Sequence, residues 1–268
     1  MPSHPSRVLV AALVAGIVSA GLLAAGALAH GEALPTKKRG VLTVAIDLGN
    51  PGFAEGTIAE PRGFSVDSSR AVARRMGLKV RYVEYPFARL FVPGPKPYDV
   101  AFEFVTILPG RARFVDFSIP YFSSTLGVLV AKDITGPVTL ARLRKLQVCA
   151  KQVTTGFFYV QDVLRPEGLV LEYPNITAAL NAVSTSICDA VIFDLPALIA
   201  AKRTTPGRYG AIAGRVGGIE YYGAVLSKGS PLRPAVNKAI ASLRRQGVFR
   251  RIGARHFGPA LASTPVIR

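Results

Sequence analysis

The stretch TILPGRARFVDFSIPY, residues 106–121, decides how the chain is interpreted, because it places an arginine just past an apolar, strand-like run. The run covers residues 99–106, and the arginine is Arg111. The planar fork of a guanidinium can hold a carboxylate through two charge-assisted hydrogen bonds. Taken alone, however, Arg111 is better explained as one more surface charge in an arginine-rich chain. The rest of the sequence decides between these two interpretations.

Length and composition indicate a globular protein with a basic surface. The chain has 268 residues, half of them apolar, which is enough for one large or two small domains. Its 33 Lys and Arg against 16 Asp and Glu give a formal net charge of +17. The basic residues are scattered in short groups, such as Arg74-Arg75 and Arg244-Arg245, and no nucleic-acid motif accompanies them. We therefore expect a solvated basic surface and no nucleic-acid partner, although net charge alone would modestly favour acidic ligands or an anionic membrane face.

The N-terminus carries the pattern of an export signal. Arg7 is followed by an uncharged run, residues 8–29, that ends in Ala27-Leu28-Ala29 before His30. A small-x-small ending of this kind predicts cleavage, so we expect residues 1–29 to be a signal peptide and the mature chain to be periplasmic. The length of the run leaves an uncleaved membrane anchor as the less favoured alternative.

Metal, nucleotide and hydrolytic chemistry have little support in the sequence. The three histidines, His4, His30 and His256, form no ligand cluster. There is no glycine-rich phosphate loop and no nucleophile motif, so we expect no metal and no other cofactor. The two cysteines, Cys149 and Cys188, each lie in or beside an apolar run. A disulfide between them and two buried free thiols both remain open.

Strand-like and helix-like segments alternate along the chain, which predicts an α/β fold with an open, mostly parallel sheet. Apolar, β-branched runs predict strands at residues 41–46, 78–85, 99–106, 126–131, 146–151, 170–173, 190–193 and 222–226. Helical periodicity predicts helices at residues 68–76, 87–92, 139–143, 157–164, 176–184 and 195–202, with one or two more within 231–257. The segment 206–218 is predicted to be a loop with a short strand. The pattern gives two α/β units of similar size.

Polar side chains follow the predicted strands in both halves of the chain. Those at or just past strand ends are Asp47, Thr106, Arg111, Lys151, Thr155 and Asp194. In open α/β sheets, ligands bind beyond the carboxyl ends of the strands. A cleft between two lobes, with a cation on one side and an anion on the other, would suit a zwitterion. Arg111 would then hold the carboxylate, and Asp194 the ammonium.

Several segments of the chain resemble the family 3 extracellular solute-binding proteins, the polar amino-acid receptors of ABC importers. They are residues 40–45, 63–67, 99–101, 106–111, 115–121 and 243–258, and the likeness spans roughly residues 38–258. The most specific piece is Arg-x-x-x-Val-Asp-Phe-Ser-x-Pro-Tyr. The resemblance implies an α/β, two-lobed type II periplasmic-binding-protein fold, with two open, mostly parallel sheets joined by two crossover strands. Lobe 1 would comprise residues 38–122 plus 223–262, and lobe 2 residues 123–222.

The resemblance also implies roles for individual residues. Arg111 matches the arginine that holds the α-carboxylate of the ligand, and Thr106 matches the threonine that assists it. Asp194 matches the aspartate that takes the α-ammonium.

Four further residues belong to the expected site, each with a plainer alternative. Phe87 lies where an aromatic ring packs on the ligand side chain, and core packing would explain it equally well. Lys151 and Thr155 lie in the second-lobe turn that contacts the ligand. Asp47 follows the first strand, as a ligand-facing aspartate does in some relatives. A plain turn role is nearly as good an explanation for these last three residues.

Four positions depart from the family pattern. Leu108 stands where a threonine usually precedes the arginine by three residues, so one hydroxyl is missing. Phe104 replaces a common glycine, and Asn50 replaces the first aromatic of the usual stacking pair. Glu103 introduces a carboxylate into a normally apolar strand. These changes predict a pocket that is narrowed by Phe104 and loosened at Asn50, which argues against a standard ligand such as glutamine.

Three functions are consistent with these features. The preferred one is a monomeric periplasmic binding protein, without catalysis, that closes its lobes over a small amino acid or related carboxylate. It would deliver this zwitterionic or carboxylate ligand to the membrane permease of an ABC importer, with a hinge near residues 121–127 and 217–223. A second is an enzyme similar to periplasmic cyclohexadienyl dehydratases, with Glu103 as the acid; the simpler interpretation is that Glu103 faces outward or pairs with a nearby arginine. A third is an accessory or sensor module that engages a protein partner.

Overall fold

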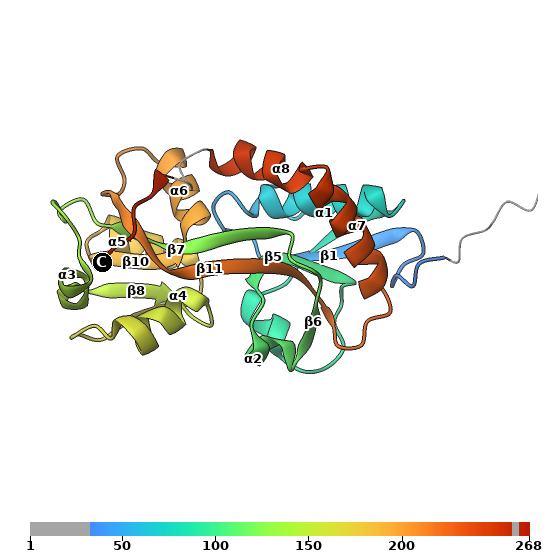
Figure 1. The fold of residues 1–268 in the computed structure, drawn as a ribbon, viewed down its shortest axis with the longest axis horizontal. Helices are drawn as coiled ribbons and strands as arrows, with labels where there is room; N and C mark the ends of the chain where they lie inside the picture. The colour runs from blue at the N-terminus through green and yellow to red at the C-terminus, as the bar shows by residue number, and fades with distance from the viewer. Residues whose placement is uncertain (1–32, 259–262) are drawn as a thin grey trace, which may run out of the picture. The chain divides into compact units, whose positions relative to one another are not determined.

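A long strand at the centre of the molecule, β11 (Ile212–Ser227), connects the two halves of the fold (Figure 1). It pairs in antiparallel orientation with β7 (Phe122–Val130), and these two strands form the crossover. On its other side β11 pairs with β5 (Val100–Thr106) and with the short β6 (Val115–Phe117). The chain therefore passes between the halves through hydrogen-bonded sheet.

The computed structural model describes residues 33–258 and 263–268. The predicted signal peptide and the alternative membrane anchor lie outside these residues. Within the described ranges, no helix has the length and apolar character needed to cross a bilayer.

Parallel strands flank the crossover on both sides. The strand order across the sheet is β4-β1-β5-β11-β7-β10-β8-β9, with β6 beside β11. The remaining strands of this sheet are β1 (Val41–Ile46), β4 (Lys79–Glu84), β8 (Val148–Lys151), β9 (Leu171–Tyr173) and β10 (Ala190–Asp194). Strand β1 is parallel to both β4 and β5, and β8 is parallel to both β9 and β10. A small separate ribbon is formed by β2 (Glu55–Gly56) and β3 (Pro61–Arg62).

Helices pack on the sheet in both halves. In the first half they are α1 (Phe64–Arg75), η1 (Phe87–Phe91), α2 (Pro109–Ala112), α7 (Arg233–Arg245) and α8 (Val248–Phe257). In the second half they are α3 (Leu140–Lys145), α4 (Thr155–Phe158), the π-helical turn η2 (Tyr159–Leu164), α5 (Ile176–Ser184) and α6 (Leu195–Thr204). Figure 1 shows α1, α7 and α8 together on one side of the sheet and α2 on the other.

The predicted α/β class and two-lobed arrangement are confirmed. The two expected sheets are joined by hydrogen bonds into one, because β7 and β11 pair with each other and each also pairs with a strand of its own half. All residues of β5 and of β10 are buried, as is usual for strands that are covered on both faces.

The segment 206–218 was predicted to be a loop with a short strand, and a strand does begin in it, at Ile212. The prediction is wrong only in the extent of that strand, because β11 continues without a break to Ser227. The glycines Gly214, Gly217 and Gly218 gave the signal of a loop. In the structure they lie where the pairing with β7 shifts register, between Ile212 and Gly214 and between Val216 and Glu220. Glycines inside a strand often mark such bulges.

The two cysteines lie in the second half as buried free thiols, one of the two alternatives that the sequence left open. Cys149 is on β8, and Cys188 shortly precedes β10. The thiol of Cys149 donates to the carbonyl of Ala179 at 3.7 Å.

The first turn of α4 abuts β10, and Gly156 makes this contact feasible. A Cβ atom at position 156 would lie 2.5 Å from the carbonyl oxygen of Ile192, which is too close for any real pair of these atoms. We expect Gly156→Ala to lower the free energy of unfolding by about 1–3 kcal/mol, measured by denaturant titration. Gly168→Ala is the matched control, because a Cβ atom there would meet no described residue within 4 Å apart from its chain neighbours. Equal stability of the two variants would contradict this packing argument.

Candidate functional site

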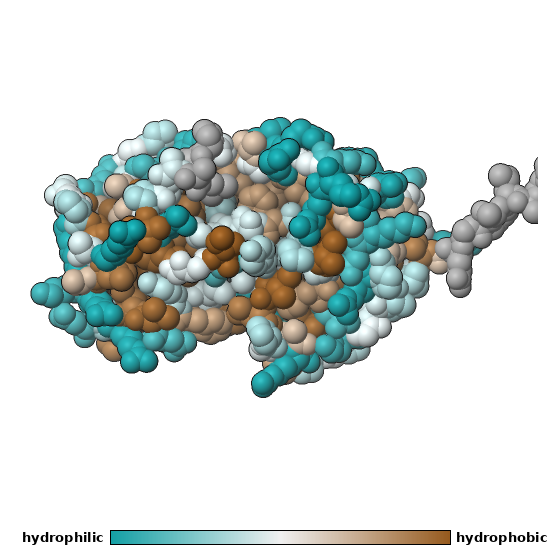
Figure 2. Space-filling view, in the orientation of Figure 1, coloured by the Kyte–Doolittle hydropathy of each residue, from teal (hydrophilic) through white to brown (hydrophobic). Residues whose placement is uncertain are grey.

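A small cavity lies where the carboxyl ends of β5 and β10 face each other across the crossover. It is lined by Phe87, Phe104, Thr106, Arg111, Lys151, Thr154, Thr155, Phe193 and Asp194. Its volume is about 10 Å³, which is room for about one water molecule. In the space-filling view, the surface is indented at the lower edge, between the sides of α2 and α4 (Figure 2). Six of the seven predicted site residues therefore meet at one place.

Arg111 is held in a fixed position by both halves of the molecule. It is buried, in α2 directly after β5, and its Nη1 donates to the carbonyl of Thr106 at 3.0 Å. Its Nη2 donates to the carbonyl of Val153, also at 3.0 Å. These bonds use two of the five guanidinium donors. Burial lowers the pKa of Arg111 to about 10, and the carboxylates of Glu220 and Asp194 oppose that shift, so the side chain stays charged at neutral pH.

Asp194 supplies the anionic side of the cavity. It is the last residue of β10, it is buried, and the hydroxyl of Tyr222 donates to its Oδ1. Burial raises the pKa of Asp194 to about 7, and the nearby charge of Glu220 adds to the shift. The carboxyl group is thus poised to lose its proton when a cation approaches.

Glu220 is a site residue that the sequence did not indicate. It lies in β11 just after the second register shift, and its Oε2 accepts a hydrogen bond of 3.1 Å from the hydroxyl of Thr106. Burial raises the pKa of Glu220, and the nearby hydroxyls of Thr155 and Thr106 and the charge of Arg111 oppose the rise. Glu220 stands two residues after the segment 206–218, which was predicted to be a loop with a short strand. Its sequence position therefore gave no indication that it belongs to the site.

Lys151 and Asp47 form an ion pair beside the cavity. The Nζ atom of Lys151 lies 2.8 Å from Oδ2 of Asp47, and the lysine side chain is only 4% exposed. Asn50 also donates to Asp47, at 2.7 Å to its carbonyl and 3.3 Å to Oδ2. Lys151 lines the cavity, whereas Asp47 lies behind it and neutralises the lysine.

The turn that follows β8 positions the second-lobe side of the cavity. The hydroxyl of Thr154 donates to the carbonyl of Lys151 at 2.7 Å and accepts from the backbone N–H of Phe157, capping α4. The cap fixes Thr155 at the start of the helix. Val153 has φ = 63°, an unusual value for a β-branched residue, and this conformation accompanies the bond from its carbonyl to Arg111.

Aromatic rings form the walls of the cavity. Phe87 is covered by cations, with the guanidinium carbon of Arg111 at 5.4 Å and Nζ of Lys151 at 5.1 Å from the ring centre. Phe104 lines the cavity, as expected from its narrowing effect, and stacks on Phe53 with ring centres 4.0 Å apart. Its φ of 45° is left-handed, a conformation that glycine adopts without strain.

Glu103 lies inside the molecule, so the simpler interpretation of this residue, an outward-facing or arginine-paired carboxylate, is wrong. It is 1% exposed, and neither carboxylate oxygen has a hydrogen-bond partner within the described part of the chain. Burial raises its pKa well above the ordinary value, the charge of Asp47 adds to the rise, and Lys151 opposes it. The cause of the failed prediction is that β5 is buried on both faces, so alternation along the strand offers no outward position.

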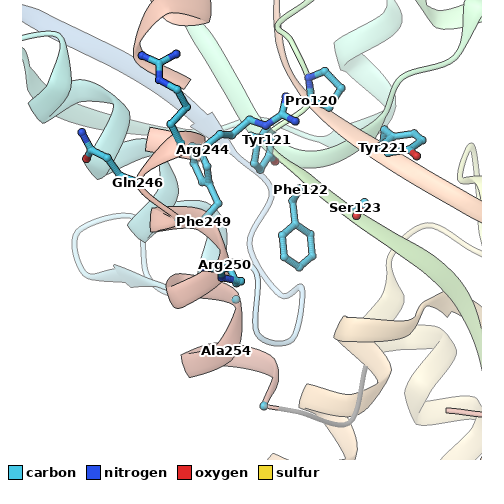
Figure 3. A pocket seen from close by; sticks show the side chains of 14 residues that line it. Pro120, Tyr121, Phe122, Ser123, Tyr221, Arg244, Gln246, Phe249, Arg250 and Ala254 are labelled. Carbon is cyan, nitrogen blue, oxygen red and sulfur yellow. The ribbon is translucent and has the colours of Figure 1, made fainter. Parts of the chain in front are cut away.

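A larger hollow, of about 690 Å³, lies elsewhere on the surface, beside the turn between α7 and α8 and the start of β7 (Figure 3). Its lining includes Tyr121, Phe249 and the arginines Arg244, Arg245 and Arg250. The described residues that line it include none of the seven predicted site residues. Size alone therefore does not identify the site that carries the paired polar groups.

The family model of bacterial extracellular solute-binding proteins, family 3, matches residues 42–259. The L-cystine-binding protein TcyJ of Escherichia coli (strain K12) is 27% identical over 258 residues, which cover 94% of this chain and 93% of the relative. The ABC transporter arginine-binding protein 1 of the same organism is 25% identical over 202 residues, covering 73% and 81%. Among solved structures, an ancestral arginine-binding protein bound to glutamine is 26% identical, with a TM-score of 0.75 over 82% of this chain and 99% of the other.

These relatives are binding proteins rather than enzymes, which agrees with the expected function without catalysis. The family match spans most of the described chain, and the fold has the expected two-lobed architecture. The chain belongs to the bacterial extracellular solute-binding proteins, family 3.

Proposed function

We propose that this protein captures a small amino acid, or a related carboxylate, between its two lobes in the periplasm and delivers it as a monomer to the permease of an ABC importer. The observation that carries the proposal is the placement of Arg111 and Asp194 around one cavity. Arg111 offers unused donors to a carboxylate, and Asp194 offers an acceptor to an ammonium group. The arginine-binding and cystine-binding relatives support an amino-acid ligand.

Ligand entry requires the lobes to separate, because the cavity has room for about one water molecule. We propose that the lobes are those expected from the sequence, residues 38–122 plus 223–262 and residues 123–222, with a hinge near the crossover segments 121–127 and 217–223. Residues 259–262 of the first lobe lie outside the described part of the chain. The contacts that join the lobes beside the cavity include the Lys151–Asp47 ion pair, the bond from Arg111 to Val153 and the bond from Thr106 to Glu220. Opening breaks these contacts and exposes both proposed anchors.

Removal of the carboxylate anchor tests the proposal directly. We expect the purified protein to bind at least one member of an amino-acid and organic-acid panel in titration calorimetry, and Arg111→Ala to weaken that binding about 100-fold or more through the loss of charge-assisted hydrogen bonds. Arg113→Ala is the matched control, because this neighbouring arginine is exposed. Unchanged affinity of the Arg111 variant would place the ligand elsewhere.

The raised pKa of Asp194 predicts a pH dependence of binding. Asp194 has a pKa of about 7 in the free protein, so its carboxyl group is mostly protonated below that pH. An ammonium group on the ligand requires the ionised carboxylate, so binding below this pH must release a proton. We expect affinity for a ligand without its own titrating side chain to fall by up to about tenfold per pH unit between pH 7 and 5. Calorimetry in buffers of different ionisation enthalpy would measure the released proton.

The variant Asp194→Asn provides the control for this pH dependence. It keeps the shape of the side chain but has no carboxyl group, so its weaker binding should be nearly independent of pH over the same range. A wild-type profile that is flat from pH 8 to 5, or that rises as the pH falls, would contradict the role of Asp194 as the ammonium acceptor.

A further inference from the structure

Glu220 places a second carboxylate directly behind the cavity lining, where it accepts a hydrogen bond from the lining residue Thr106. Thr106 donates to it at 3.1 Å, and the Thr155 side chain lies near enough to favour its charged form. Arg111 lies near enough to attract it electrostatically. The carboxylate of Glu220 therefore shares its immediate surroundings with the position proposed for the ligand carboxylate.

When Asp194 and Glu220 are both ionised, as the proposed binding of an ammonium group to Asp194 requires, the charges around the cavity leave one negative charge without a partner. Lys151 and Asp47 neutralise each other at 2.8 Å. Arg111 is then the remaining cation among the described lining residues, and it faces both Asp194 and Glu220. These two carboxylates repel each other when both are charged, and this repulsion contributes to the raised pKa of Asp194. One guanidinium cannot balance both.

A neutral zwitterion does not correct this imbalance. Its carboxylate on Arg111 and its ammonium on Asp194 cancel each other, and Glu220 is left beside a second carboxylate in a partly buried site. Two neighbouring negative charges repel each other strongly where water is excluded, and this repulsion weakens binding. A ligand that also carries a cationic side chain supplies the missing charge.

The cavity walls suit a cation on an apolar stem. Phe104 and Phe193 line the cavity with ring centres 6.2 Å apart, and neither is among the rings that Arg111 and Lys151 cover. An aliphatic stem can pack on these rings, and a guanidinium or ammonium group is attracted to an aromatic face. Of the other acidic residues nearby, Asp47 is already paired with Lys151, and burial raises the pKa of Glu103 well above its ordinary value, which favours its neutral form.

We propose that Glu220 is a specificity-determining residue that selects amino acids with a cationic side chain by pairing its carboxylate with that cation. This inference rests on the proposed function, because it takes Arg111 and Asp194 as the anchors of the amino-acid backbone. The competing explanation is that Glu220 only ties Thr106 to Thr155. Glutamine at position 220 would keep an acceptor for both hydroxyls and remove only the charge.

The experiment compares L-arginine with L-citrulline, which has nearly the same shape but a neutral side-chain end. Titration calorimetry on the wild-type protein should show arginine bound at least about 30-fold more tightly, since close charge pairs at partly buried sites contribute strongly. Glu220→Gln should reduce this ratio to within about threefold, mainly by weakening arginine. Glu220→Asp, which keeps the charge, should retain most of the preference. Glu60→Gln is the matched control, because Glu60 is exposed.

The outcomes separate this inference from the proposed function. A wild-type preference near one, or a preference that Glu220→Gln leaves intact, overturns the role of Glu220 while binding that depends on Arg111 still stands. The wild-type ratio needs no variant, so a folding defect in a variant cannot hide the answer. Failure of the wild-type protein to bind any amino acid overturns both proposals together.

Discussion

The antiparallel pairing of β7 with β11 is the constraint on which the rest of the structure depends. It joins two parallel half-sheets into one, so the carboxyl end of β5 in one half faces that of β10 in the other. Arg111 and Asp194 follow from this geometry, because each lies at or just beyond one of those strand ends. The site is thus a property of the sheet topology, to which the loops add the turn at Val153 and the capped start of α4.

The site combines buried charged groups with aromatic rings, and the rings influence how strongly the charges interact. The rings exclude water, which strengthens every electrostatic interaction among Arg111, Asp194 and Glu220. The same exclusion makes an unpaired carboxylate expensive, which explains the raised pKa values of both acids. Lys151 is held close to the site without adding net charge, because Asp47 pairs with it.

The sequence predicted those parts of the fold that depend on local patterns. The continuous apolar runs of β5 and β10 identified buried strands, and polar residues directly after them identified Arg111 and Asp194 as a pair. Glu220 was missed because its position depends on an irregularity in the strand pairing between Val216 and Glu220. The glycines at 214, 217 and 218 are typical of a loop as much as of such an irregularity. Glu103 was misplaced because strand alternation predicts an outward face only where solvent covers one side of a sheet. Both failures concern tertiary surroundings that no short pattern encodes.

The bulge between Val216 and Glu220 also has a mechanical consequence. A rotation of one lobe against the other must be taken up by twisting of the two crossover strands, and an irregularity in the ladder is the softest point for such torsion. When a lobe rotates, residues far from the hinge are displaced by large distances, whereas a residue at the hinge is displaced very little. If the proposed function holds, Glu220 stays in place while the lobes open and close, and Arg111 and Asp194 move relative to it. Under the two proposals, Glu220 could contact the cationic side chain of the ligand when the ligand first enters the open cleft. Arg111 and Asp194 would contact its carboxylate and ammonium groups only after the lobes close.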